Sequence, residues 1–135
     1  MVQKTETFDI SEFELQDTGI LTLQNASGTG DLIVNGEPVT IELYGPGSDV
    51  SRQFEHKEAT AAAVRLRKTF QGKIDTEGEE REQVAKLVRR TKAISPNFPI
   101  TPNALYSNRK LIYIHAQVLK FLGDEANFSK ASTTT

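Results

Sequence analysis

The 135-residue sequence contains no cysteine and no tryptophan, and only two histidines. The lack of cysteine excludes disulfides, thiolate metal ligands and cysteine nucleophiles. His56 and His115 stand on different predicted helices, and neither has a second ligand three or four residues further along. Metal sites on helices are typically marked by such pairs. We therefore expect no metal and no cofactor.

Motifs for catalysis are also missing from the sequence. No serine lies in a G-x-S-x-G nucleophile elbow. The Gly28-Thr29-Gly30 segment is followed by Asp31 and a predicted strand, whereas a phosphate-binding loop leads into a helix N-terminus. These observations predict that the protein is not an enzyme.

Long apolar runs are absent as well. None approaches the ~18 residues that a membrane span needs, and the first seven residues contain no apolar run of the kind found in a signal peptide. We expect no membrane contact and a cytoplasmic location. The composition, 37% hydrophobic and 25% charged, is ordinary for a globular protein. It predicts a single domain over residues 1–128 and a disordered tail over 129–135.

Charge is distributed unevenly along the chain. Residues 1–45 contain eight acidic residues against Lys4 alone, whereas 15 basic residues stand against 10 acidic ones from residue 46 onward. This asymmetry is compatible with head-to-tail self-association, and equally with ordinary solvated surfaces. Two basic clusters lie near predicted helix ends, at residues 65–68 and 89–92. Cations at helix C-termini are stabilised by the helix dipole and need no nucleic acid to explain them. The pI of about 5.7 also argues against a nucleic-acid partner, so nucleic-acid binding is not expected.

Residues 1–45 are predicted to form a small β region. Three segments are predicted to be strands, namely 20–24, 31–34 and 38–44, and the alternation of apolar and polar residues is clearest in the last of them. Asn35 and Gly36 between the last two tolerate the positive φ of a type I′ turn, which predicts a hairpin. Residues 25–30 form the predicted loop between the first two segments. A sheet of only two or three strands is not stable alone, so another element must pack against its apolar face.

Residues 46–94 are predicted to form two helices. The first begins at Ser48 or Asp49 and ends near Gln71, with Gly72 as its C-terminal stop. Two apolar series recur at helical spacing along it: Val50, Phe54, Ala61, Val64 and Ala59, Ala63, Leu66, Phe70. Together they form a broad stripe, wide enough to cover the sheet and to touch something else.

The second helix is predicted to begin at Thr76, where Thr76 to Glu79 match a capping box. Its apolar stripe is narrow, so we expect this helix to be mostly solvated and the more mobile of the two. Residues 95–103 contain three prolines and are predicted to be an extended connector. A C-terminal helix over 104–123 follows. The whole is predicted to be an α+β fold.

Three parts of the chain together resemble the tail assembly chaperones of long-tailed bacteriophages. They are the β segments 18–23 and 30–34, the strand 39–45 followed by Asp49 and a charged helix with Arg52, and the ending 111–121 closed by 124–128. The resemblance covers most of residues 15–128. It implies a non-enzymatic protein of the bacterial host cytoplasm that binds the tape measure protein and helps to recruit tail tube subunits. Partner contacts are expected from six residues: Phe54, Val64, Phe70, Tyr113, Phe121 and Phe128.

Two other functions remain open on the sequence. The first is a virion structural protein, a tail or head–tail connector component, that assembles through its β hairpin edge or its acidic N-terminal region. The second is a nucleic-acid-binding regulator that uses the basic helix ends. For Tyr113, Phe121 and Phe128, the alternative to a partner contact is a position in the hydrophobic core.

Overall fold

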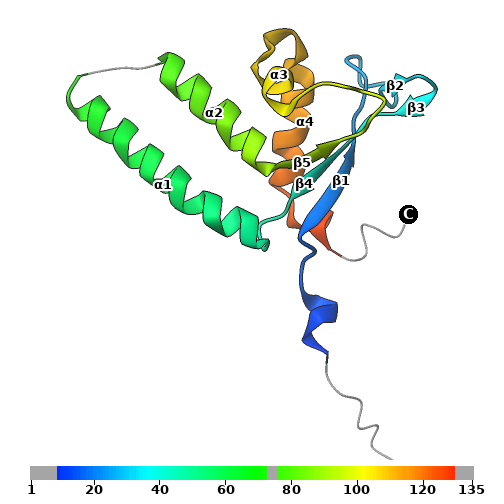
Figure 1. Ribbon diagram of the computed structural model, residues 1–135, viewed down its shortest axis with the longest axis horizontal. Coiled ribbons are helices and arrows are strands. Elements are labelled where there is room, and N and C mark those ends of the chain that lie inside the picture. The colour runs from blue at the N-terminus through cyan, green and yellow to red at the C-terminus, as the bar shows by residue number, and fades with distance from the viewer. Residues whose placement is uncertain (1–8, 73–75, 130–135) are drawn as a thin grey trace, which may run out of the picture.

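The computed structural model describes residues 9–72 and 76–129, which form an α+β fold (Figure 1). The main sheet is antiparallel, with the strand order β1 (Thr18–Thr22), β4 (Thr40–Tyr44) and β5 (Thr91–Ile94). The short strands β2 (Ile33–Val34) and β3 (Glu37–Pro38) form a separate hairpin. The predicted fold class is confirmed.

The β2–β3 hairpin turns at the predicted dipeptide. Asn35 has a φ of 54° and Gly36 a φ of 77°, as a type I′ turn requires. A bridge between Gln24 and Asp31 closes the predicted loop over 25–30. The strand after the hairpin continues into β4, and its partner in the main sheet is β1, with Ile20 opposite Glu42.

Strand β5 was not expected from the sequence. The second helix was predicted to extend to residue 94, but α2 (Thr76–Arg90) ends earlier and Thr91–Ile94 pair with β4, Ile94 opposite Ile41. Thr91 follows the last helical residue, and its hydroxyl donates to the Leu87 carbonyl over 2.8 Å. The second edge of β4 offers hydrogen bonds to the β-branched Thr91 and Ile94, and this tertiary pairing overrides the local helical pattern.

Helix α1 (Asp49–Phe70) follows the sequence prediction at both ends. The Ser48 hydroxyl accepts a hydrogen bond from the Ser51 amide over 3.0 Å, and Gly72 has a φ of 76°. Helix α2 begins at Thr76 as predicted, whereas a capping contact of the Thr76 side chain lies outside the described residues.

The core lies between one face of the main sheet and three helices. Leu23, Val39, Ile41 and Leu43 of the β region are buried against Leu87 of α2, Leu105 and Tyr106 of α3 (Pro102–Ser107), and Ile114 and Val118 of α4 (Ile112–Leu122). Of the α1 side chains, only Ser51 is buried. The expectation that helix α1 covers the sheet is therefore wrong, and so is the expectation that α2 is mostly solvated.

The predicted C-terminal helix over 104–123 is interrupted. Asn108 is extended, with a φ of −87° and a ψ of 107°, and its side chain accepts from the Lys110 amide at the start of a 3₁₀ turn, η2 (Arg109–Leu111). Pro102 occupies the first turn of α3, where its missing N–H costs nothing. Two further 3₁₀ turns, η1 (Ile10–Phe13) and η3 (Glu125–Phe128), flank the domain. Most of the predicted tail, residues 130–135, lies outside the described residues.

Candidate protein-docking surface

Helix α1 is attached to the rest of the protein near its N-terminal end. The Ser51 hydroxyl donates to the Gly45 carbonyl over 2.6 Å and accepts from Arg90 Nη1 over 3.0 Å. Arg90 Nη2 also lies 3.3 Å from Glu58 Oε2, and Arg89 Nη1 lies 3.8 Å from Glu58 Oε1. These side chains are mostly buried, so the ion pairs are little weakened by solvent. The N-terminal half of α1 is thereby held against the end of α2.

One face of α1 is directed toward α2. It consists of the half-buried residues Phe54, Glu58, Ala61 and Arg65, which recur every three or four positions. Glu58 contacts α2 through its ion pairs, and Ala61 and Arg65 line a cleft shared with α2. We refer to these four residues as the inner face.

A second apolar row lies on the other side of α1. It comprises Ala59, Ala63, Leu66 and Phe70, all exposed, with Leu66 58% and Phe70 82% exposed. At 100° per residue the row is centred about 140° away from the inner face. Its spacing of four, three and four residues is that of the a and d positions of a coiled coil. We refer to these four residues as the outer stripe.

Charges of both signs lie beside the outer stripe, and exposed Asp49 is in line with Arg67 along the same edge. Arg52 lies in line with it toward the N-terminus, and Arg67 lies along one edge of it, with Glu55 on the other. All three side chains are exposed. Among the described residues, no ion pair involves the guanidinium of Arg52 or of Arg67. The outer stripe therefore combines an apolar surface with exposed charges of both signs, and the cation nearest to Leu66 and Phe70 is Arg67.

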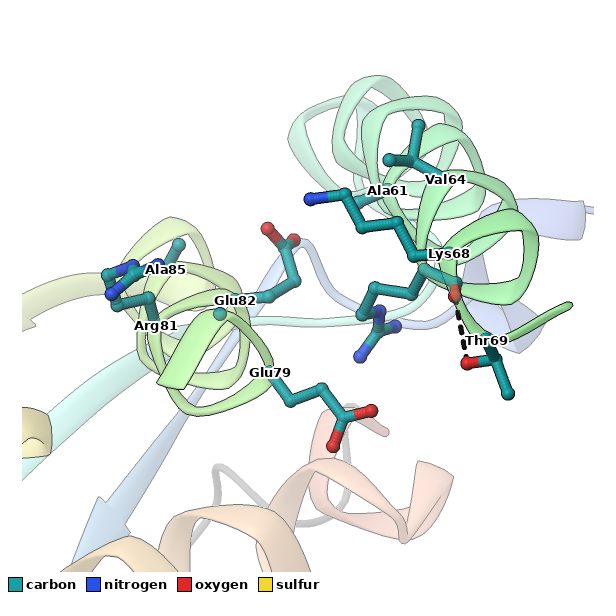
Figure 2. A pocket seen from close by; sticks show the side chains of 10 residues that line it. Ala61, Val64, Lys68, Thr69, Glu79, Arg81, Glu82 and Ala85 are labelled. Carbon is teal, nitrogen blue, oxygen red and sulfur yellow. Dashed lines mark hydrogen bonds between the residues drawn. The ribbon is translucent and has the colours of Figure 1, made fainter. Parts of the chain in front are cut away.

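A cleft of about 470 Å³ separates the C-terminal half of α1 from the N-terminal half of α2. Figure 2 shows Lys68 and Glu82 reaching into this space from opposite helices, with Ala61, Val64 and Ala85 nearby. Both signs of charge are present along it, and its apolar lining is made of small side chains. This cleft offers less continuous apolar surface than the outer stripe.

The three partner-contact residues predicted on α1 do not share one surface. Phe54 is half-buried on the inner face, and Val64 is 42% exposed beside the cleft. Phe70 lies on the outer stripe. The structure therefore separates the three predicted contacts and leaves Phe70 as the most exposed of them.

The three predicted contacts near the C-terminus belong to the core or its margin. Tyr113 and Phe121 are half-buried and pack against the core cluster. Phe128 is 0% exposed, and its ring meets that of Phe121 edge to face at 5.3 Å. A partner contact through Phe128 is thus wrong for this conformation, because the ring fills the space at the end of β1 and β4.

The predicted contact list did not include Leu66, Ala59 or Ala63. Their helical series was visible in the sequence, but it was merged with the Phe54 series into one broad stripe. Its regular spacing of four, three and four residues was the signal that could have separated them. Two apolar rows on nearly opposite sides of one helix indicate two different neighbours.

The remaining polar clusters offer no further site. His115 packs edge to face against Tyr106 at 6.2 Å, while His56 is exposed on α1. Within residues 9–72 and 76–129, no three His, Asp or Glu side chains gather as metal ligands would. Nor does any helix in this part of the chain combine the length and hydropathy of a membrane span.

Comparison with known proteins identifies no relative of the chain. No protein-family model, no curated protein and no solved structure matches the chain.

Proposed function

We propose that the protein is a non-enzymatic assembly chaperone that holds a helix of its partner on the outer stripe of α1. The partner class follows from the resemblance of the sequence to phage tail assembly chaperones. It is the tape measure protein, around which tail tube subunits are recruited in the host cytoplasm. The observation that carries the proposal is the exposed row of Ala59, Ala63, Leu66 and Phe70.

The physical properties of the outer stripe suit a helical partner. Its coiled-coil spacing places the apolar side chains along one seam, into which a second helix can insert its own apolar residues. Burial of Leu66 or Phe70 would contribute about 1.5–3 kcal/mol each before the costs of association. Such contacts are individually weak, but many copies bound along one long helix gain by multivalency and can still be removed singly.

The contacts at the base of α1 favour the same function. The ion pairs of Glu58 with Arg89 and Arg90 hold the helix in place before any partner arrives. A binding surface that is already ordered avoids part of the entropy cost of association. The C-terminal half of α1, which carries Leu66 and Phe70, projects away from the sheet (Figure 1). This position leaves room for a long partner.

The test is co-expression of the protein with a tape-measure-type coiled-coil protein, followed by affinity capture of the latter. We expect wild type to be captured at several copies per partner, and the double variant Leu66→Asp, Phe70→Asp to be lost. Ile112→Asp is the matched control, since Ile112 is 60% exposed but lies on α4. Equal capture of all three proteins would rule out the outer stripe as the binding site.

A second candidate function is that of a virion structural component, and the β region favours it. Ile20 is 63% exposed on β1 and Ile33 is 52% exposed on β2, which gives the sheet and its hairpin an apolar surface of their own. A structural component remains in the finished particle, whereas an assembly chaperone leaves it. Mass spectrometry of purified virions separates the two functions.

A further inference from the structure

The segment that precedes the sheet exposes two large apolar side chains. Residues 9–14 form the turn η1 and its flanks, and we refer to them as the N-terminal arm. Ile10 is 59% and Phe13 is 71% exposed, and the turn contains no buried residue. Figure 1 shows the arm leaving the sheet in a direction away from the C-terminal end of α1. Within one molecule, the arm therefore lies far from Leu66 and Phe70.

The geometry of the arm matches that of the outer stripe. Residues three apart are eclipsed in a 3₁₀ helix, so Ile10 and Phe13 project from the same side. They are separated by about 6 Å along the axis, at roughly 2 Å per residue. Leu66 and Phe70 are also about 6 Å apart along α1, at 1.5 Å per residue. Two pairs of apolar side chains with equal spacing can pack against each other.

The charge of the arm is opposite to that beside Leu66 and Phe70. The arm carries Asp9, Glu12 and Glu14, all exposed, within a region of the chain that is strongly acidic. At Leu66 and Phe70, the outer stripe is bordered by the exposed guanidinium group of Arg67. Opposite charges around an apolar contact accelerate encounter and fix its orientation.

We propose that the protein self-associates head to tail, the N-terminal arm of one copy binding to the outer stripe of the next. Ile10 and Phe13 pack on Leu66 and Phe70, and the acidic arm faces Arg67. This single contact covers both exposed apolar surfaces, whereas pairing of two outer stripes covers only one of them and leaves the arm exposed. Because the two surfaces differ, the contact repeats along an open chain or closes into a ring.

The inference is independent of the proposed function, although both use the outer stripe. A neighbour's arm and a partner helix compete for Leu66 and Phe70 if both proposals hold. Self-association would then keep the apolar stripe covered until the partner displaces the arm. An arm variant retains an intact stripe, so its capture by the tape-measure-type protein tests the function separately.

The test is sedimentation velocity on four full-length proteins. The arm variant carries Ile10→Asp and Phe13→Asp, the stripe variant carries Leu66→Asp and Phe70→Asp, and Ile112→Asp is the control. We expect wild type and the control to form oligomers that grow with concentration and weaken with salt. Each double variant alone should be monomeric, with association weakened by about tenfold or more.

The decisive sample is an equimolar mixture of the two double variants. The arm variant still offers a stripe and the stripe variant still offers an arm, so the mixture should form dimers and nothing larger. Oligomers of the arm variant alone would show instead that two stripes pair, and a monomeric wild type at all concentrations would also overturn the proposal. Circular dichroism confirms that the variants are folded, which is expected because all four replaced side chains are exposed.

Discussion

Phe128 lies so close to Gly45 that a β-carbon at Gly45 would be 2.7 Å from the Cδ1 atom of the ring. Gly19 on β1 is equally confined, because a β-carbon there would be 2.7 Å from the Asn127 carbonyl oxygen. The Phe128 carbonyl also accepts a hydrogen bond of 2.7 Å from the Gln16 amide. Turn η3 thus closes one end of the core, and two glycines make the space for it.

Replacement of Gly45 by alanine is expected to destabilise the protein. The added methyl group meets a ring that is fully buried, so either the ring or the strand must shift. Overpacking of this kind costs about 1–3 kcal/mol. Gly47→Ala is the control, since its β-carbon would meet only the Leu15 Cβ atom at 4.0 Å. Urea unfolding measures both, and equal stability of the two variants would contradict the packing of Phe128.

Replacement of Ser51 by alanine tests the attachment of α1. The Gly45 carbonyl keeps a second donor in the Ser48 hydroxyl, at 2.9 Å, but Arg90 Nη1 loses its 3.0 Å contact in a buried setting. We expect a loss of about 1–3 kcal/mol in the free energy of unfolding. Thr60→Ala removes an exposed hydroxyl from the same helix, and this control should stay within about 0.5 kcal/mol of wild type. An unchanged Ser51→Ala variant would argue against the polar cluster at the base of α1.

The sequence predicted those features that depend on neighbouring residues. The Asn35-Gly36 turn, the Ser48 cap and the Gly72 stop each follow from local backbone chemistry, and all three are present. Strand β5 was missed because its pairing with β4 is decided by residues some 50 positions away. The residues around Thr91 in the sequence do not show that the helix ends before it and that it pairs with β4.

The packing of the helices was predicted less well for a related reason. Periodicity shows that a helix has an apolar face, but it does not show which neighbour covers that face. Helix α1 has the longer apolar pattern, yet much of it is alanine, while α2 buries Leu87 in the core and packs Val84 and Val88 against it. Phe54, Val64 and Phe70 were chosen together as contacts, but they do not share one side of α1, because its two apolar rows are on nearly opposite sides.

Tyr106 is expected to make stability depend on pH in the alkaline range. Burial raises the pKa of its phenol above the ordinary value of 10.0, and the hydrogen bond with Thr91, of 2.6 Å, acts more weakly in the other direction. The unfolded chain therefore loses this proton at a lower pH than the folded protein does. Stability is complete below about pH 10 and falls as the pH rises from there through the raised pKa.

The measurement is the free energy of unfolding in urea between about pH 8 and about pH 11, for wild type and Tyr106→Phe. The variant keeps the ring but has no phenol proton to lose. The free energy of unfolding of wild type should therefore decrease relative to that of the variant as the pH rises. Parallel curves for the two proteins would mean that Tyr106 does not contribute to the alkaline loss.

The contrast between α1 and α2 gives the last prediction. Leu87 on α2 is 1% exposed within the core, whereas Leu66 on the outer stripe is 58% exposed. Leu87→Ala should therefore cost about 2–5 kcal/mol, because it removes buried methyl groups and leaves a cavity. Leu66→Ala should change the free energy of unfolding by no more than about 0.5 kcal/mol, since the side chain contacts mainly solvent.

Both leucine variants are measured by urea unfolding of dilute protein, so that contacts between copies do not add to the stability of wild type. A cost for Leu66→Ala as large as that for Leu87→Ala would show that the outer stripe is covered within the single molecule. It would then be unable to bind either a partner helix or a neighbour's arm. A small cost, together with loss of capture for Leu66→Asp, Phe70→Asp, would mean that these residues serve binding rather than folding.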